Sequence, residues 1–504
     1  MNMQQTVDFN VGVRRNLVVN AGRLELPGVI APSFSRNSTA FAHNGLQVGV
    51  NSPRYETGRF DRASMTEEGT TNLLPEAISQ GRSGADSNNS AFSTRTFVSN
   101  FGRSSLFSMR SEQVAAGSNR GFFTLDGNHA PVTAGLVYTI TCWVFTNHSA
   151  RTAQVSVNFL NSAGAMLSNV VGVHTPLVPG EWTRLFVIAT APTDAVHARV
   201  VSTASESAIG DRYWYTDIQV EQKPYATSWQ LGGTPRVGEL ITVPTTGVVN
   251  PVEGTVEFWW QPINQPTSDM TTQITSPQII RMGSYFINNS WVLWNWSGRL
   301  DLLVRGAEAT GWTGNWSVIS GTAWHQLNRW YHMAVRWSGG NTFWVFVDGV
   351  RYGPYVSTHA FTGVAGNVME LGGIRSSGHA NALYDDLRVS NHARTDAEIQ
   401  AAFNSGMPAP VDAHTTYLLR LDGSLAHGQG GDYTSPEYDM STVGTVAASS
   451  ISWHAPTDEV SRTISARIDD QAWTPVANGG NLPFVLGQLV TGRRLQLRVQ
   501  LRRG

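Results

Sequence analysis

Residues 328–352 read NRWYHMAVRWSGGNTFWVFVDGVRY, and this stretch decides the fold. Apolar side chains recur at every second position, which is the pattern of a β-strand with one buried face. The Asp348-Gly349 pair lies between Phe346 and Val350, and an Asp-Gly pair between two such runs is a strong signal for a two-residue hairpin turn. We therefore predict antiparallel strands that meet at this turn.

A second stretch, residues 381–399, reads NALYDDLRVSNHARTDAEI and predicts a strand that runs into a short helix. Thr395 can cap that helix, and Glu398 follows three residues later, which is the spacing of a capping box. In this order the elements resemble the laminin-G-like, concanavalin-type jelly roll, whose strands carry W-x-H-x-A-V, V-D-G and D-D-x-R-V motifs. The resemblance covers residues 238–424 and implies an antiparallel sandwich, to which we assign residues 238–440.

The composition fits β-sandwiches, because the 504 residues include 49 Gly and 17 Trp but only 14% charged residues. A formal net charge of -2 gives no positive field for phosphate backbones, so we expect no nucleic-acid partner. We expect no membrane partner either, since no stretch approaches 18 apolar residues, and the first residues lack the regions of a signal peptide. The single cysteine, Cys142, lies in an alternating stretch and is predicted to be a buried structural thiol.

Residues 76–237 predict a first sandwich. The stretches at 138–145 and 153–160 alternate at a period of two, and residues 181–190 form a further strand. The closing sequence WYTDIQVE, at 214–221, resembles the penultimate strand of jelly-roll carbohydrate-binding modules.

This resemblance also concerns metal binding. Modules of this kind often hold a structural calcium ion through carboxylate and carbonyl oxygens, and Asp217 is the residue at the matching position. The alternative is that Asp217 caps a turn or pairs with Arg212. We expect that the chain requires no cofactor.

The two ends of the chain carry weaker patterns. Residues 1–75 are short β-prone pieces that cannot bury much apolar area alone, and the sequences at 35–48, 52–55 and 66–74 resemble a module of bacteriophage structural proteins. The resemblance implies a virion protein of a tailed phage, with residues 1–75 as an N-terminal attachment segment ordered by neighbouring subunits. Residues 441–504 predict a small β-domain similar to one that follows laminin-G-like domains in phage tail proteins.

The sequence offers no catalytic signature. A hydrolase on a concanavalin-type scaffold carries its acid and nucleophile on alternate positions of one strand, about 5 Å apart, and no Glu-x-Asp-x-x-Glu motif is found. Asp385 and Asp386 are adjacent, so we expect them to leave opposite faces of a strand and to be structural. Zinc, serine-hydrolase and phosphate-loop motifs are missing too. We therefore predict that the protein is not an enzyme.

Tryptophan is dense between residues 290 and 330, a turn-rich stretch. Sugars are bound by aromatic faces and a few fixed polar groups. We therefore take as candidate ligand-binding residues Trp291, Trp294, Trp296, Trp312 and Trp316. The alternative is that alternate tryptophans fill a core, because Trp294 and Trp296 share one face of a strand and Trp291 takes the other.

Together these patterns predict an all-β, multidomain chain: two jelly-roll β-sandwiches in tandem plus a small C-terminal β-domain. The predicted function is that of a bacteriophage virion structural protein, associated with the tail or its fibres, which contributes scaffolding and adhesion to host-surface glycans. We expect it to be made in the host cytoplasm, to assemble with other virion subunits and to form a homo-oligomer. Two alternatives stay open: an architectural capsid-decoration or collar protein without glycan binding, and a glycan depolymerase.

Overall fold

The structure is a computed structural model that describes most of the chain beyond residue 53 and several short strands before it. The described residues are 13–15, 18–20, 23–25, 33–35, 42–43, 46–47, 54–86, 91–116, 119–205, 207–264, 277–283, 287–296, 299–307, 309, 311–321, 324–373, 379–421, 430–434, 438–439, 446, 460–478, 480–484, 488–491 and 493–503.

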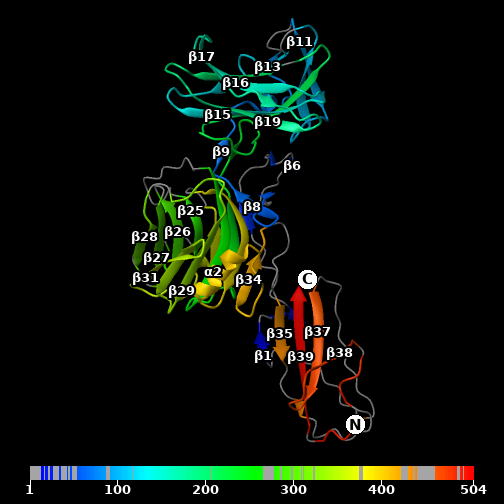
Figure 1. Ribbon diagram of the computed structural model, residues 1–504, viewed down its shortest axis with the longest axis vertical. Coiled ribbons are helices and arrows are strands. Elements are labelled where there is room, and N and C mark those ends of the chain that lie inside the picture. The colour runs from blue at the N-terminus through cyan, green and yellow to red at the C-terminus, as the bar shows by residue number, and fades with distance from the viewer. Residues whose placement is uncertain are drawn as a thin grey trace.

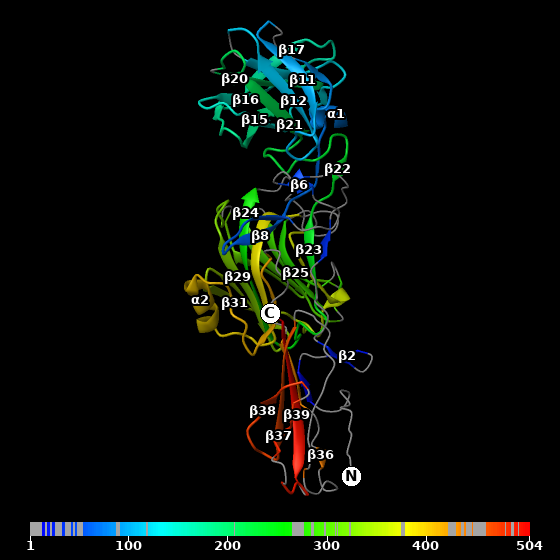
Figure 2. The same cartoon turned by 90° about the vertical axis from the view of Figure 1, so that its right-hand side faces the viewer.

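The chain is nearly all β, with 51% strand and 5% helix, and is built from several sheets, as the composition predicts. Three units follow one another along the long axis of the molecule (Figure 1). A first sandwich lies at one end, a second sandwich lies in the middle, and a small C-terminal sheet lies at the other end; the perpendicular view in Figure 2 shows the same order. No helix among the described residues is long and apolar enough to span a bilayer.

The first sandwich packs a five-stranded sheet against a seven-stranded one. The five strands, in spatial order, are β11 (Ser93–Ser99), β12 (Phe107–Gln113), β21 (Arg212–Glu221), β15 (Val137–Phe145) and β19 (Trp182–Thr190). The opposite sheet contains β10 (Ala85–Asp86), β13 (Asn119–Thr124), β20 (His197–Ser205), β16 (Thr152–Leu160) and β17 (Met166–Val171), with β14 (Ala130–Pro131) on β20 and β18 (Thr175–Pro176) on β16. The short helix α1 (Glu76–Ser79) precedes them.

The core between these sheets is built from the inward positions of each strand. Cys142 is fully buried there, as predicted from its alternating stretch, and burial raises the pKa of its thiol to about 12. A thiol in this state is not a nucleophile at neutral pH.

The second sandwich is a concanavalin A-like, laminin-G-like jelly roll. Its seven-stranded sheet contains β28 (Gly314–Ile319), β27 (Arg299–Arg305), β26 (Ser290–Trp296), β25 (Gln278–Met282), β32 (Val368–Leu371), β23 (Leu240–Pro244) and β4 (Ser33–Ser35). Its eight-stranded sheet contains β31 (Val350–Val356), β30 (Thr342–Val347), β29 (Tyr331–Ser338), β24 (Gly254–Asn264), β33 (Asn381–Ser390), β8 (Arg62–Thr66) and β7 (Tyr55–Thr57), with β34 (Thr415–Leu419) on β33. The helices are α2 (Asp396–Ser405) and the 3-10 turn η1 (Ala365–Asn367).

Two local predictions are confirmed in this sandwich. Val347 and Val350 are the last paired residues of β30 and β31, so Asp348 and Gly349 form the two-residue turn. Thr395 caps α2: its hydroxyl accepts from the Glu398 backbone N–H at 3.2 Å, and the Glu398 carboxylate accepts from the Thr395 N–H at 2.7 Å.

The sandwiches are nested rather than in tandem. β8 pairs with residues 382–384 of β33, and β34 pairs with a later part of the same strand. In the other sheet, β4 pairs with β23. The chain therefore begins the second sandwich, leaves it to form the whole first sandwich, and returns. The prediction of residues 1–75 as a separate attachment segment is wrong for these strands, because β33 and β23 of the same chain, rather than other subunits, provide their pairing.

The C-terminal sheet also draws on distant parts of the chain. It contains β1 (Val13–Arg15), β35 (Gly430–Thr434), β39 (Arg494–Arg503), β37 (Val460–Ile468) and β38 (Thr474–Val476), with β36 (Tyr438–Asp439) on β39. Its boundary therefore lies before residue 430 and not at 441. Three two-stranded ladders complete the fold, formed by β2 (Val18–Asn20) with β3 (Arg23–Glu25), β5 (Ala42–His43) with β6 (Leu46–Gln47), and β9 (Thr70–Thr71) with β22 (Pro235–Arg236).

The chain crosses between the two sandwiches along β9 and β22, and a buried ion cluster holds this junction. Arg54 pairs with Glu67 at 2.9 Å and also with Glu239, while Arg236 pairs with Glu67 at 2.8 Å. All four side chains are at most 3% exposed. We call these four residues the junction cluster. Because a buried charge is costly unless it is paired, each member depends on the others.

Replacement of Arg54 by methionine should lower the free energy of unfolding by about 3–5 kcal/mol, because Glu239 would lose its closest cation inside the protein. Urea unfolding followed by tryptophan fluorescence measures the change. The matched control is Arg82→Met, whose partner Glu76 lies 3.8 Å away and half exposed, and which should cost at most about 1 kcal/mol. Equal effects of the two substitutions would contradict the role of the junction cluster.

Candidate functional site

Three aromatic side chains stand in line across adjacent strands of the first sandwich. Trp214 of β21 lies directly opposite Phe145 of β15, and Phe145 lies directly opposite Trp182 of β19. Val144, the chain neighbour of Phe145, and Tyr213 and Tyr215, the chain neighbours of Trp214, are buried in the core. The alternation of side chains therefore turns Phe145 and Trp214, and with them the paired Trp182, to the outer face of the five-stranded sheet. All three are half-buried.

A fourth ring, Phe101, comes from the loop between β11 and β12 and packs among the other three. Its ring centroid lies 5.1 Å from that of Phe145, 5.2 Å from that of Trp214 and 5.8 Å from that of Trp182. Phe101 remains 36% exposed. We call these four residues the aromatic row. Together they form an accessible surface of ring faces and edges on the five-stranded sheet, whose strands β12, β15 and β21 are labelled in Figure 2.

The loop that carries Phe101 is anchored to Asp217. The Asp217 carboxylate accepts hydrogen bonds from the Ser104 hydroxyl and the Ser105 backbone N–H, and it forms an ion pair with Arg103 at 3.7 Å. Arg103 in turn lies over the ring of Trp143, with its guanidinium carbon 3.5 Å from the ring centroid. The loop therefore has two fixed points next to Phe101, one electrostatic and one by cation–π contact.

These contacts concern Asp217, the residue at which a structural calcium ion was predicted. Asp217 is fully buried, and burial raises the pKa of its carboxyl group. The hydrogen bond from Ser104 and the charge of Arg103 act in the opposite direction and lower this pKa. Its cation partner is Arg103 and not Arg212, which bonds to Glu112 instead. Calcium binding at Asp217 stays a prediction. Within the residues described, no group of three or more His, Cys, Asp or Glu is arranged to hold a metal ion.

One end of the aromatic row is flanked by charged side chains. Arg110 of β12 lies directly opposite Trp214, one strand further along the sheet. Glu112 and Arg212 face each other in the next outward row, and Arg212 donates two hydrogen bonds to the Glu112 carboxylate, at 3.0 and 3.3 Å. The site thus combines aromatic faces with hydrogen-bonding side chains at its rim, which is the chemistry that recognises sugars.

The tryptophans expected to form the site lie in the second sandwich, and the structure buries two of them. Trp291 belongs to the main core and packs against Trp337, with ring centroids 6.2 Å apart. Trp294 is also 0% exposed and lies on the other side of β26, against Val292 and Leu303. The prediction of a ligand-binding role is therefore wrong for Trp291 and Trp294, because packing consumes both ring faces.

The other three candidates differ in their surroundings. Trp312 is half-buried and meets Trp294 edge to face, with centroids 6.2 Å apart. Trp316 is half-buried against Tyr355, at 5.4 Å. The side chain of Trp296 lies outside the described residues. Trp312 and Trp316, the two of these three whose side chains are described, thus pack against different rings.

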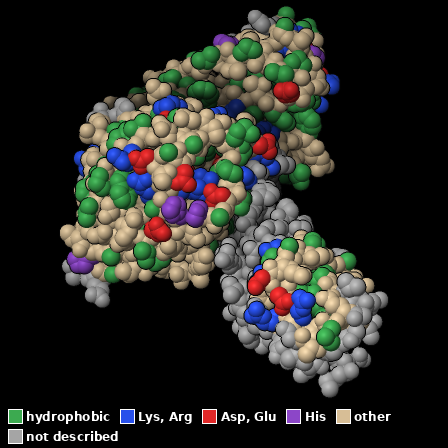
Figure 3. All heavy atoms as spheres, turned by 60° about the horizontal axis from the view of Figure 1, so that its bottom comes forward, with side chains coloured by type: hydrophobic (Ala, Val, Ile, Leu, Met, Phe, Trp, Pro, Cys, Tyr) green, Lys and Arg blue, Asp and Glu red, His purple; other side chains and the backbone are tan. Residues whose placement is uncertain are grey.

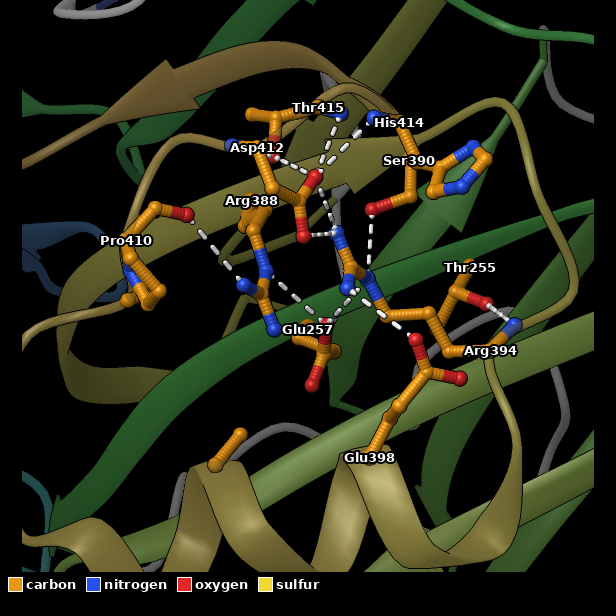
Figure 4. A network of polar contacts seen from close by, with 12 residues as sticks. Thr255, Glu257, Arg388, Ser390, Arg394, Glu398, Pro410, Asp412, His414 and Thr415 are labelled. Carbon is orange, nitrogen blue, oxygen red and sulfur yellow. Dashed lines mark hydrogen bonds and ion pairs between the residues drawn. The ribbon is translucent and has the colours of Figure 1, made fainter.

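A network of charged and polar side chains lies on the eight-stranded sheet of the second sandwich (Figure 4). Glu257 of β24 is buried between Arg388, at 2.6 Å, and Arg394, at 3.4 Å. Burial raises the pKa of Glu257, while the two guanidinium groups oppose the rise. Arg394 extends the network to Asp412 at 2.8 Å and to Ser390 at 2.8 Å. These contacts join β24 and β33 to the segments on either side of α2.

The charged groups of this network are paired with one another. Figure 3 shows acidic, basic and histidine side chains gathered on one part of the second sandwich. In the same sandwich, Asp396 pairs with Arg336 and Arg351, each at 2.7 Å, and the rings of His392 and His414 stack 4.6 Å apart. The network therefore acts as a clamp that fixes α2 on the sheet.

Asp385 and Asp386 bind separate loops. Asp385 accepts hydrogen bonds from the backbone N–H groups of Arg59, at 2.8 Å, and Phe60, at 3.2 Å, and so holds the β7–β8 turn. Asp386 pairs with Arg420 and accepts from the backbone N–H of Ala409. Both carboxylates thus have structural partners.

Sequence reasoning identified the strands that carry the aromatic row but not the row itself. The alternation in residues 138–145 and 181–190 shows that each strand has two faces. It places Phe145 on one face of the first strand and Trp182 on one face of the second. Which face is outward, and which residues stand opposite one another, depends on strand pairing. Aromatic residues at positions that face the same side in several predicted strands are the signal in the sequence that points to the row.

Comparison with known proteins places the second sandwich in a fold family. Residues 236–400 match the concanavalin A-like lectin/glucanases superfamily. The match covers only this part of the chain. No curated protein matches the chain.

Solved structures show distant similarities. A xylan-binding domain of Xyn10C from Paenibacillus barcinonensis is 12% identical, with a TM-score of 0.25 over 32% of this chain and 99% of that one. The N-terminal modules of xylanase 10B from Clostridium thermocellum are 18% identical, with a TM-score of 0.24 over 33% of this chain and 30% of that one. The enzymatically active domain of tailspike protein 2 of bacteriophage CBA120 is 17% identical, with a TM-score of 0.29 over 36% and 29% of the two chains. Similarities at this level carry no inference about ligand or activity, and the match spans under a third of the xylanase and tailspike chains.

Removal of the Asp217 carboxylate should release the loop that presents Phe101. In Asp217→Ala, trypsin should cleave after Arg103 about tenfold faster, because the side chain of Arg103, now 11% exposed, would lose its ion pair and the loop its hydrogen bonds. Limited proteolysis with mass spectrometry measures the rate. Asp126→Ala, at a side chain that is 94% exposed, is the control and should leave cleavage at Arg103 unchanged. Unchanged cleavage in Asp217→Ala would show that the loop is held by other contacts.

Proposed function

We propose that this chain is a glycan-binding structural protein of a tailed-bacteriophage particle, in the tail or its fibres, and that it binds host-surface glycans without turnover. The aromatic row of the first sandwich carries the glycan part of the proposal. It is the place in the described structure where four aromatic side chains meet on an outer face with charged side chains beside them.

The physical case rests on exposure and rigidity. Sugar rings present C–H groups that stack on aromatic faces, and an aromatic surface binds best when it is held in place before the ligand arrives. The rings of the aromatic row stand on strands, and the loop of Phe101 is tied to Asp217. Adjacent strands are about 5 Å apart, so the row offers successive contacts along an extended ligand.

The second sandwich supports the same proposal in a different way. Its residues 236–400 match a superfamily that includes lectins as well as glucanases. The carboxylates Glu257, Asp385 and Asp386 are each engaged by arginines or backbone N–H groups, which favours scaffolding over hydrolysis. The particle context comes from the sequence between residues 35 and 74, with its resemblance to a module of phage structural proteins. Partners would be other virion subunits, among them copies of this chain.

Replacement of Trp182 or Trp214 by alanine should weaken glycan binding by at least tenfold, because each substitution removes a ring face at the centre of the surface. Binding of the purified protein to a panel of bacterial surface polysaccharides, followed by affinity electrophoresis, measures the effect. Phe97→Ala, at a 38% exposed ring on β11 of the same sandwich, is the matched control and should bind normally. If the wild-type protein binds a polysaccharide and both tryptophan variants bind it equally well, the aromatic row is not the site.

Electron microscopy of the particle tests the virion assignment. We expect density for this elongated chain in the tail or its fibres, with the face of β15, β19 and β21 open to solvent. If that face is instead covered by a neighbouring subunit, the protein is architectural and the glycan role is excluded. Absence of the chain from purified particles would overturn the virion assignment.

A further inference from the structure

The chemical class of the glycan can be inferred from the charges at one end of the aromatic row, and this inference rests on the proposed function. We propose that the ligand of the aromatic row is an anionic polysaccharide, whose negatively charged substituents are bound by Arg110. The chemistry concerned is that of a carboxylate or sulfate group on a sugar that stacks at Trp214.

Arg110 is placed to meet a ligand on the row. It stands directly opposite Trp214 in the pairing of β12 with β21, so the two side chains leave the same face of the sheet as neighbours, with Cβ atoms about 5 Å apart. The Arg110 side chain is 30% exposed. A substituent on a sugar at Trp214 therefore lies within reach of the guanidinium group.

The charge of Arg110 is only partly compensated, because it shares one carboxylate with a second arginine. Its ion-pair partner is Glu112, at 3.6 Å, which is beyond hydrogen-bond distance. Glu112 is already engaged by Arg212 through two hydrogen bonds. One carboxylate thus serves two guanidinium groups, and the better geometry belongs to Arg212, which leaves a net positive charge beside the row.

One hydrogen-bond donor of Arg110 is also unused. Its Nε atom is buried and has no hydrogen-bond partner in the described structure. A guanidinium group presents a planar fork of donors that suits carboxylate and sulfate oxygens, and such charge-assisted bonds are stronger than neutral ones. A neutral sugar offers hydroxyl oxygens as acceptors but no negative charge to pair with the guanidinium group.

The other arginines near the row are balanced by acids. Arg103 pairs with Asp217 and lies over Trp143, and Glu56 of β7 adds a second negative charge near it. Arg184 lies in the field of Asp217, Glu221 and Glu67 and donates to the backbone oxygen of Thr227. The excess positive charge is therefore confined to the Trp214 end, which predicts a defined position for the anionic group and not a general attraction.

The test compares acidic polysaccharides with matched neutral ones. Polygalacturonate, alginate and hyaluronan are each paired with their carboxyl-reduced derivatives, and dextran sulfate is paired with dextran, in affinity electrophoresis of the full chain. We expect the acidic form of at least one pair to bind at least tenfold more tightly than its neutral form, and this preference to weaken as salt is raised. The pair that shows the preference distinguishes carboxylate from sulfate.

Two variants connect the preference to Arg110. Arg110→Gln should lose roughly tenfold in affinity for the acidic form and keep its affinity for the neutral form. The control, Arg199→Gln, lies on β20 of the opposite sheet with a side chain 28% exposed and should behave like the wild type. Circular dichroism and melting temperature show whether each variant is folded.

The outcomes separate this inference from the function on which it rests. Equal binding of acidic and neutral forms, or an Arg110→Gln variant that keeps the full preference, would overturn the anionic class while glycan binding stands. Failure of the folded wild-type protein to bind any polysaccharide, in this set or among bacterial surface glycans, would overturn glycan binding itself.

Discussion

The buried charges of the junction cluster are the constraint on which the arrangement of this chain depends. Arg54 and Glu67 come from the first passage of the chain through the second sandwich, and Arg236 and Glu239 come from its return. Because none of these charges is stable alone in the interior, the outgoing and returning segments must lie together. Glu67 and Arg236 are 169 positions apart in the sequence, and the residues between them can then fold only as an insertion, which is why the sandwiches are nested. β9 and β22 add a short ladder to the same junction.

Many of the aromatic and charged side chains described in the second sandwich pack in its core or form ion pairs with one another, so few of them are available to a ligand. Trp291 and Trp337 fill the core, and the outer face of the eight-stranded sheet carries α2, fixed by the network around Glu257. A β-sheet has two faces, and here each is used to hold the fold. Trp291 and Trp294, which the sequence suggests as ligand-binding residues, are therefore buried by packing.

The first sandwich, by contrast, keeps one sheet face open. Its core takes the inward positions of β15, β19 and β21, while the outward positions hold the aromatic row and the charged group of Arg110, Glu112 and Arg212. Asp217 also has a structural role in this sandwich, because its carboxylate pairs with Arg103 and orders the loop that carries Phe101. The proposed division of roles, with the second sandwich as support and the first as the glycan-binding unit, rests on these different uses of their outer faces.

The sequence by itself determined the strands, the hairpin at Asp348-Gly349, the capping box at Thr395 and the buried state of Cys142, because each depends on spacing within a few residues. Only the tertiary structure decided that the sandwiches are nested, that β1 and β4 pair with strands hundreds of residues away, and that the aromatic row and not the tryptophans around residue 294 lies on an open face. Period-two alternation says that a strand has two faces. It cannot say which face is covered, because that depends on pairing partners which the local sequence does not specify.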